Sequence, residues 1–164
     1  MILLREVSIQ NWFNIIMLRS AGDQENKIFE KNIASNCFSL AQSSIERNWI
    51  TKAIYNNETL IGFTMYGYSE ELQGYEICRI MIDFNHQGKG YGKESLNLVI
   101  QEMVYHFKCK EILLSFHPEN EKAKRLYESV GFKNTGKVVK GFVDELIYSI
   151  ETEQYTEYCR YSIT

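Results

Sequence analysis

The sequence predicts one α/β domain built on a mixed sheet, and three observations support this fold class. Hydrophobic residues make up 45% and charged residues 24% of the 164 residues, as is typical of a globular domain with its own core. Segments in which apolar residues alternate are interspersed with segments of helical period. No repeat, linker or low-complexity stretch divides the chain. The expected order of elements is β-α-α-β-β-β-loop-α-β-α-β-β.

The N-terminal third predicts one strand and then helices. Apolar residues alternate over residues 2–7, which favours a strand. Residues 8–21 have helical spacing, with Ser8 as the expected N-cap. Residues 22–50 are polar with scattered apolar positions, so we expect one further helical region there, or two short helices.

The middle of the chain predicts strands. Residues 51–55 and 59–68 flank the turn Asn56-Asn57-Glu58, which is typical of a hairpin. Residues 76–82 (EICRIMI) are expected to form the next strand.

The second half predicts two helices between strands. Apolar residues recur at spacings of three and four over 92–108, so a helix is expected there. Residues 111–116 are almost wholly apolar, which favours a central strand. Residues 120–132 predict a short helix that stops at Gly131. The last two strands are expected at 136–142 and 145–150.

Charge and cysteine usage exclude several classes of protein. The net charge is −3 and no dense block of lysine and arginine occurs, which argues against a nucleic-acid partner and suits a small cationic substrate. None of the four cysteines lies in a C-x-x-C pair, so neither a zinc site nor a disulfide framework is expected. Arg5 and Glu6 come too early for a signal peptide, and no apolar run approaches the ~18 residues of a membrane span. We therefore expect a cytoplasmic protein with no membrane partner.

Three glycines between a strand and a helix predict an anion site. Gly88, Gly90 and Gly92 do not match the spacing of a mononucleotide P-loop or of a dinucleotide fingerprint. They do fit the pattern Q-x-x-G-x-G that begins at Gln87, in which backbone amides at a helix N-terminus face an anion. Lys89 and Lys93 could add positive charge. The alternative is a glycine-rich turn without a ligand.

A second motif follows this loop at a distance that identifies a family. After the helix and the strand comes N-x-x-A-x-x-x-Y-x-x-x-G-F at residues 120–132. The combination resembles the GNAT superfamily of acetyl-CoA-dependent N-acetyltransferases over about residues 50–150. The resemblance implies a mostly antiparallel mixed sheet flanked by helices, with a V-shaped splay between the strands at 76–82 and 111–116. It also implies acetyl-CoA as co-substrate. Because the sequence contains no plausible cluster of metal ligands, we expect no metal.

The resemblance implies where the co-substrate would bind. The strand before the loop would pair with the pantetheine arm, and a backbone amide near its end would face the thioester oxygen. The loop would hold the pyrophosphate. The implied cofactor-binding residues are Ile80, Met81, Ile82, Gln87, Gly88, Lys89, Gly90, Tyr91, Gly92, Lys93, Asn120, Ala123 and Lys124.

Two catalytic residues are expected. Tyr127 matches the family tyrosine that faces the departing sulfur, so we expect it to protonate the thiolate, although a core aromatic residue is the alternative. Polyamine-acetylating relatives often carry an acid where Cys78 stands, which leaves the general base open. Glu76 lies two residues earlier, hence on the same strand face, and is our candidate base; the alternative is a solvated strand-end carboxylate.

Other charged or titratable residues are weaker candidates for substrate or metal binding. Four acids could bind a cationic substrate or could simply lie at the surface: Glu25, Glu30, Asp144 and Glu145. The three histidines show no metal-ligand spacing, and a structural role is the simpler interpretation for each: His86, His106 and His117.

The expected function is transfer of acetyl to a primary amine. Residues 34–43 and 60–67 look similar to bacterial spermidine/spermine and diamine acetyltransferases, so a polyamine is the expected acceptor. An aminoglycoside, an amino acid or a protein N-terminus could be acetylated instead, or the chain could be a non-catalytic acetyl-CoA-binding module. We expect one domain over 1–150 and leave the tail 151–164 without a role. Because this family often dimerises, a homodimer is one expected state.

Overall fold

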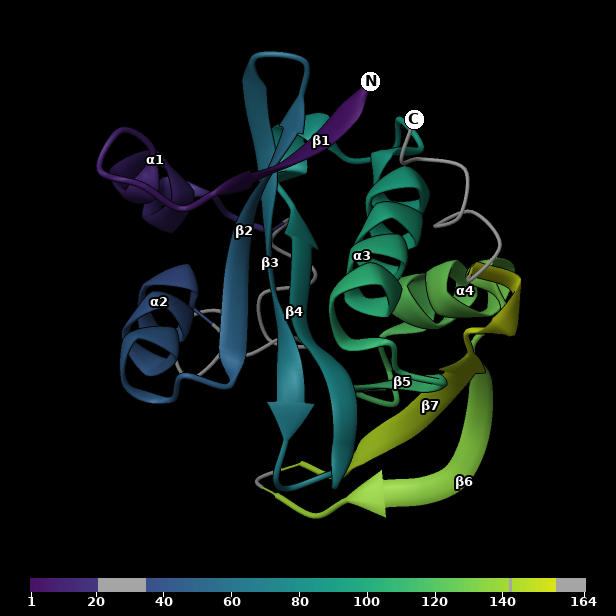
Figure 1. Ribbon diagram of the computed structural model, residues 1–164. Helices are drawn as coiled ribbons and strands as arrows, with labels where there is room; N and C mark the ends of the chain where they lie inside the picture. Colours follow the sequence, from purple (N-terminus) through teal and green to yellow (C-terminus); the bar gives the residue numbers. More distant parts are fainter. Residues whose placement is uncertain (21–34, 142, 156–164) are drawn as a thin grey trace.

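The computed structural model describes residues 1–20, 35–141 and 143–155, and these form one sheet with helices on both faces (Figure 1). The elements follow in the predicted order. They are β1 (Ile2–Glu6), α1 (Trp12–Met17), α2 (Asn36–Ile45), β2 (Trp49–Asn56), β3 (Thr59–Ser69), β4 (Gly74–Ile82), the 3₁₀ helix η1 (Phe84–His86), α3 (Tyr91–Phe107), β5 (Glu111–Phe116), α4 (Glu121–Val130), β6 (Lys133–Val139) and β7 (Glu145–Glu151).

The strands lie in the order β1-β2-β3-β4-β5-β7-β6. All neighbouring strands are antiparallel except β4 and β5, which are parallel and share one paired position, Glu76 opposite Leu113. Beyond this position the two strands diverge (Figure 1). The predicted fold class, a mostly antiparallel mixed sheet with a splay at this place, is therefore confirmed.

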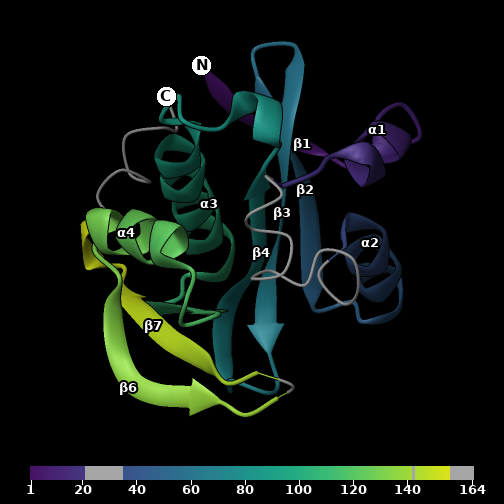
Figure 2. The same ribbon diagram turned by 180° about the vertical axis from the view of Figure 1, so that it is seen from behind.

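Helices cover the two faces of the sheet separately. Figures 1 and 2 show α1 and α2 on one side and α3 and α4 on the other. On the first side Ile15 and Leu18 pack with Ala53, Phe63 and Met65 of the sheet. On the second side α3 buries the apolar stripe that the sequence predicts, at positions 96, 99, 100, 103 and 104. Burial on both faces fixes the register of the central strands.

The first helix is shorter than predicted. It spans Trp12–Met17 rather than residues 8–21, and its N-cap is Asn11 rather than Ser8. The Oδ1 atom of Asn11 accepts a hydrogen bond from the Ser8 amide at 2.8 Å, and its Nδ2 donates to the Glu6 carbonyl at 3.0 Å. These bonds hold residues 8–11 in a turn, so the helix begins after it.

Two other boundaries differ from expectation. Of the helical region expected at 22–50, the structure describes α2, whose N-cap Ser35 accepts from the Phe38 amide at 3.1 Å; residues 21–34 lie outside the described residues. Strand β6 begins at Lys133 rather than at 136, because residues 133 and 134 already pair with β7. The hairpin expected at Asn56-Asn57-Glu58 is confirmed, with Asn57 in the left-handed region at φ 53°.

Candidate active site

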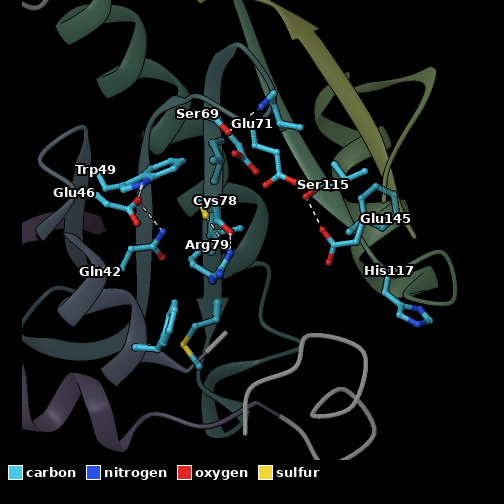
Figure 3. Close-up of a pocket in the computed structure, with 18 of the residues that line it drawn as sticks. Gln42, Glu46, Trp49, Ser69, Glu71, Cys78, Arg79, Ser115, His117 and Glu145 are labelled. Atoms are coloured by element: carbon cyan, nitrogen blue, oxygen red, sulfur yellow. Dashed lines mark hydrogen bonds between the residues drawn. The ribbon is translucent and has the colours of Figure 1, made fainter. Parts of the chain in front are cut away.

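A cleft of about 740 Å³ opens where β4 and β5 diverge, a size that suits a small-molecule ligand. Figure 3 shows Gln42, Glu46 and Trp49 on one wall and Ser115, Glu145 and His117 on the other, with Cys78 and Arg79 between them. The cleft is therefore bordered by α2 and β2 on one side and by β5 and β7 on the other. The lining residues that were expected from the sequence are Glu76, Ile80, Met81, Asn120, Tyr127 and Glu145.

A β-bulge in β4 shapes the cleft floor. Arg79 pairs with Met65 and Ile77 pairs with Tyr66, so Cys78 is an extra residue on β4. The Thr64 hydroxyl donates to the Arg79 carbonyl at 2.8 Å and helps to hold this irregular backbone. Because of the bulge, residues 77 and 80 pack on the α3 side while 78 and 81 pack on the α1 side. Bulges are common beside active sites because they re-aim side chains.

The far end of β4 has one open edge. Ile80, Met81 and Ile82 pair with β3 on one side, whereas β5 pairs with β4 at Glu76 alone among the described residues. Unpaired backbone groups of an edge strand can bind an extended, amide-bearing chain. Gly62 allows β3 to lie close here, because an added Cβ would come within 2.3 Å of the Met81 carbonyl oxygen. The geometry is compatible with the expected contact of this strand with pantetheine.

The glycine loop forms an anion-binding shape. Gly88 and Gly90 have φ of 75° and 82°, and Gly90 is the N-cap of α3. The backbone amides of residues 88–92 donate to no described residue. A Cβ added at Gly88 or Gly90 would meet nothing within 4 Å, so the space in front of the loop is open. Consecutive free amides at a helix N-terminus form a nest that fits a phosphate, and the loop therefore fits the pyrophosphate of coenzyme A.

Side chains around the loop mostly hold it in place. The Gln87 Nε2 donates to the Ile82 carbonyl at 2.9 Å, and its Oε1 accepts from Lys122 Nζ at 2.7 Å. Lys89 Nζ donates to the Asn85 carbonyl at 3.1 Å, and Lys93 Nζ donates to the Ser129 carbonyl at 3.0 Å. Both ammonium groups thus contact main-chain oxygens, from which they could still turn toward a bound anion. The loop's remaining polar side chain also has a partner, because Tyr91 Oη accepts from Asn56 Nδ2 at 3.0 Å.

The start of α4 borders the cleft. Asn120 is the N-cap of α4, and its Oδ1 accepts from the Ala123 amide at 3.2 Å. Ala123 is partly buried against the core, and Lys124 follows it in the first turn. Asn120 is buried and lines the cleft, so its cap fixes the helix that carries Tyr127.

Tyr127 is buried and lines the cleft. Its ring packs against Phe116 and Phe132, with centroid separations of 5.3 and 6.0 Å. Burial, and to a lesser extent the charge of Glu145, raise the pKa of Tyr127 to about 12. The phenol is therefore protonated at neutral pH and is available as a hydrogen-bond donor.

Glu76 is a buried carboxylate, not a solvated one. It is 7% exposed and lines the cleft at the one position where β4 and β5 pair. Burial raises its pKa, while a hydrogen bond with Ser69 and the charge of Arg79 lower it less strongly. The alternative of a solvated strand-end residue is therefore wrong. A buried carboxylate with a raised pKa is a stronger proton acceptor, as a general base requires.

Cys78 cannot serve as the acid that was expected at its position. Burial raises the pKa of its thiol to about 12, and the thiol accepts a hydrogen bond from Arg79 Nη1 at 3.0 Å. A neutral thiol is neither a base nor a nucleophile at neutral pH.

Of the acids that could bind a cation, the structure brings one into the cleft. The Oε2 atom of Glu145 accepts from the Ser115 hydroxyl at 2.6 Å, and its charge raises the pKa of both Glu76 and Tyr127. Asp144 instead pairs with Lys140 at the surface. Glu25 and Glu30 lie outside the described residues.

Sequence reasoning missed three further acids that line the cleft: Glu46, Glu70 and Glu71. They come from the end of α2 and from the turn between β3 and β4, and neither segment carries a recognisable motif. Periodicity alone could not place them, because their neighbourhood depends on contacts between distant segments.

The described residues contain no group of three or more His, Cys, Asp or Glu side chains that could hold a metal ion. His86 lies in η1, His106 lies against Phe107 in α3, and His117 follows β5 at the cleft. Across the described ranges, no helix combines the length and the apolar character of a membrane span.

Known proteins resemble this chain both in sequence and in structure. Residues 8–132 match the model of the acetyltransferase (GNAT) family. A spermine/spermidine N(1)-acetyltransferase of Bacillus subtilis (strain 168) and a probable spermine N(1)-acetyltransferase of Bacillus subtilis subsp. natto (strain BEST195) are each 38% identical over 91 residues. The match covers 52% of this chain and 60% of each relative, so the chain spans less than two thirds of their length.

Solved structures share the fold. A spermidine N-acetyltransferase from Vibrio cholerae, in complex with coenzyme A and spermine, has a TM-score of 0.76 at 22% identity, covering 94% of this chain and 98% of that one. An aminoglycoside acetyltransferase in complex with coenzyme A has a TM-score of 0.75 at 13% identity, covering 98% and 99%. The family model spans well over half of the sequence. The chain belongs to the GNAT family of acetyltransferases.

Proposed function

We propose that the protein transfers the acetyl group of acetyl-CoA to a primary amine of a polyamine such as spermidine or spermine, by direct attack in a ternary complex. The observation that carries this proposal is the acidic cleft at the splay of β4 and β5. Its carboxylates outnumber its one arginine, Arg79, and so favour a positively charged acceptor. These carboxylates are Glu46, Glu70, Glu71, Glu76 and Glu145.

We infer that acetyl-CoA binds along the glycine loop and the edge of β4. The free amides of residues 88–92 fit its pyrophosphate, and the open edge of β4 at 80–82 fits its pantetheine arm. Ala123 and Lys124 lie on the first turn of α4, where they would border the phosphate side, and Asn120 caps that turn. Bound in this way, acetyl-CoA would supply an acetyl group activated as a thioester.

Glu76 is the proposed general base. A polyamine nitrogen arrives as an ammonium, which must lose a proton before its lone pair can form the new N–C bond. The raised pKa of Glu76 favours acceptance of that proton, either directly or through a water molecule. Formation of the N–C bond is balanced by breakage of the C–S bond, whose electrons leave on the sulfur.

Tyr127 is the proposed donor to the departing sulfur. Its pKa of about 12 lies well above the ~8.5 of a thiol, so full proton transfer to the thiolate is uphill. A hydrogen bond from the phenol to the developing thiolate needs no such transfer and still stabilises the charge. We therefore propose that Tyr127 first stabilises the thiolate and that the proton follows as the sulfur becomes solvated.

Two further features support a polyamine as the acceptor. Both Bacillus relatives carry names that specify acetylation of spermine or spermidine. The net charge of −3 would steer a polycation toward the protein. On this view acetylation rates fall as ionic strength rises, because salt screens the attraction.

An assay of thiol release with a panel of amines tests the proposal. Spermidine and spermine should turn over faster than a lysine peptide or kanamycin, and calorimetry should detect acetyl-CoA binding in the presence of a chelator. Preference for kanamycin would make the acceptor an aminoglycoside. Binding of acetyl-CoA without turnover of any amine would indicate a non-catalytic module.

A further inference from the structure

The α2 wall of the cleft carries a carboxylate that is held in one orientation. Glu46 follows the last residue of α2, and its Oε2 atom accepts hydrogen bonds from Trp49 Nε1 at 2.8 Å and from Gln42 Nε2 at 2.9 Å. Its Oε1 atom accepts none from any described residue. Two donors on one oxygen fix the carboxylate and leave the other oxygen for a further donor.

The side-chain amide of the neighbouring Gln42 also has an oxygen that accepts no hydrogen bond from the described residues. The Oε1 atom of Gln42 is buried and accepts no hydrogen bond within the described part of the chain. The bond from its Nε2 to Glu46 fixes which end of the amide is the oxygen. Buried acceptors are rarely left without a donor, so this atom points to a ligand that donates hydrogen bonds.

The helix itself adds negative potential at this place. Helix α2 ends at Ile45, and its last turn contains no basic residue. The C-terminal end of a helix carries partial negative charge and favours a cation. The indole of Trp49 lies beside these acceptors on the same wall (Figure 3), and aromatic rings also bind ammonium groups.

One cation lies between this wall and the opposite one. Arg79 lines the cleft between the walls, and its Nη1 donates to the Cys78 carbonyl at 2.7 Å (Figure 3). Its charge repels an ammonium placed in the middle of the cleft. An acceptor that crosses this region therefore needs a neutral alkyl segment there and cationic groups at its ends.

We propose that Gln42, Glu46 and Trp49 form a subsite for a second ammonium group of the acceptor, while its reacting amine lies at Glu76. This inference rests on the proposed function and deepens it, because it names the part of the cleft that distinguishes a polyamine from a monoamine. The ligand class is an alkyl chain with at least two separated ammonium groups.

A kinetic test compares two acceptors in the Glu46→Gln variant. The variant keeps the size of the side chain but removes its charge. We expect the ratio of kcat/KM for spermidine to that for butylamine to fall about tenfold or more, through a higher KM for spermidine, because a hydrogen bond to a charged group is lost. The control Glu153→Gln removes the same charge from an exposed position outside the cleft and should leave the ratio unchanged.

A binding test does not depend on turnover. The sequence contains two tryptophans, and Trp12→Phe leaves Trp49 as the fluorescent probe. Spermidine should change its emission in the Trp12→Phe background and should do so at about tenfold higher concentration, or not at all, when Glu46→Gln is added. Gln42→Leu gives a second variant in case Glu46→Gln fails to fold, with the same expected direction.

The outcomes separate the subsite from the proposed function. Spermidine-dependent emission without acetylation would support the subsite and defeat the function. Acetylation of spermidine with an unchanged acceptor ratio and unchanged emission in a folded variant would overturn the subsite alone. An equal loss on spermidine and butylamine would also overturn it, because the wall would then act on every acceptor.

Discussion

Two acidic side chains on opposite faces of the sheet, Glu102 and Glu76, have different surroundings. Glu102 of α3 accepts a hydrogen bond from the Tyr66 hydroxyl at 2.6 Å and pairs with Lys52 at 2.9 Å. Lys52 also pairs with Glu6 at 2.6 Å, so this cluster joins β1, β2, β3 and α3. Charges with partners on four elements hold the fold together.

Glu76 has no such cation. It is buried at the cleft and forms no ion pair with another described residue. The charge of Arg79 offsets only part of the effect of burial on its pKa. Glu102 is partly buried and paired, whereas Glu76 is buried without a paired cation. The difference teaches that a paired acid is structural, whereas a buried acid kept without a paired cation marks a site that could be used for chemistry.

Replacement of Glu76 should give the largest effect. Glu76→Gln keeps the shape but removes the proton acceptor, and loss of a general base typically costs ~10²–10⁴-fold in rate. We therefore expect kcat to fall at least about 100-fold with saturating acetyl-CoA. Wild-type kcat in this variant would show that Glu76 is not the base.

The same variant should be more stable than the wild type. Because the folded-state pKa of Glu76 lies above its usual value of 4.5, ionisation above that pH costs the folded protein stability. Glu76→Gln should therefore raise Tm at neutral pH, and the gain should shrink as the pH falls below the unfolded-state value of 4.5, where the side chain becomes protonated in both states. Thermal scans across this range measure the effect, and a lower Tm at pH 7 would contradict it.

Removal of Lys52 should have the opposite effect to removal of Glu76: stability should fall and activity should not. Lys52→Met leaves Glu102 and Glu6 without their cation, which should cost about 2 kcal/mol, or roughly 30-fold in the folding constant. The cleft is untouched, so kcat should stay near wild type. Urea unfolding measures the loss, with the exposed Lys137→Met as the matched control. A large loss of kcat with unchanged stability would contradict a structural role for the cluster around Lys52.

The sequence predicted those parts of the fold that depend on residues close together in the chain. The alternating strands, the apolar stripe of α3 and the Q-x-x-G-x-G loop each depend on residues close in the chain. The pairing of Lys52 with Glu102 does not, because it joins residues fifty positions apart through the packing of α3 on the sheet. No periodicity distinguishes these charges from surface charges.

The sequence likewise predicted only part of the cleft. Motif register placed Asn120 and Tyr127, and strand alternation placed Glu76 beside Cys78. The bulge at Cys78 shifts the alternation beyond it, and Glu46 reaches the cleft because α2 ends against β2. The short length of α1 was also missed, since the turn held by Asn11 competes with the helical pattern.

Replacement of Tyr127 should give a smaller effect than that of Glu76. Tyr127→Phe keeps the packing on Phe116 but removes the hydroxyl, so we expect kcat to fall by about tenfold or more with little change in the Kd of acetyl-CoA. Tyr148→Phe is a matched control, because Tyr148 packs on the same phenylalanine but does not line the cleft. If kcat stays at wild type and only Tm shifts, Tyr127 is a core aromatic residue and water protonates the thiolate.

Replacement of Cys78 should give the smallest effect, although it lies next to Arg79 on the cleft floor. A thiol with a pKa of about 12 stays neutral at pH 7 and cannot accept an acetyl group, so no acetyl-cysteine should form. Cys78→Ala should change kcat by less than about threefold, because only a partly buried side chain and the hydrogen bond from Arg79 are lost. Steady-state rates and mass spectrometry of the protein mixed with acetyl-CoA alone measure this. The contrary result would be acetylation of the wild-type protein that disappears in Cys78→Ala, together with a large loss of kcat. It would mean that the acetyl group passes through Cys78 and that the amine does not attack acetyl-CoA directly.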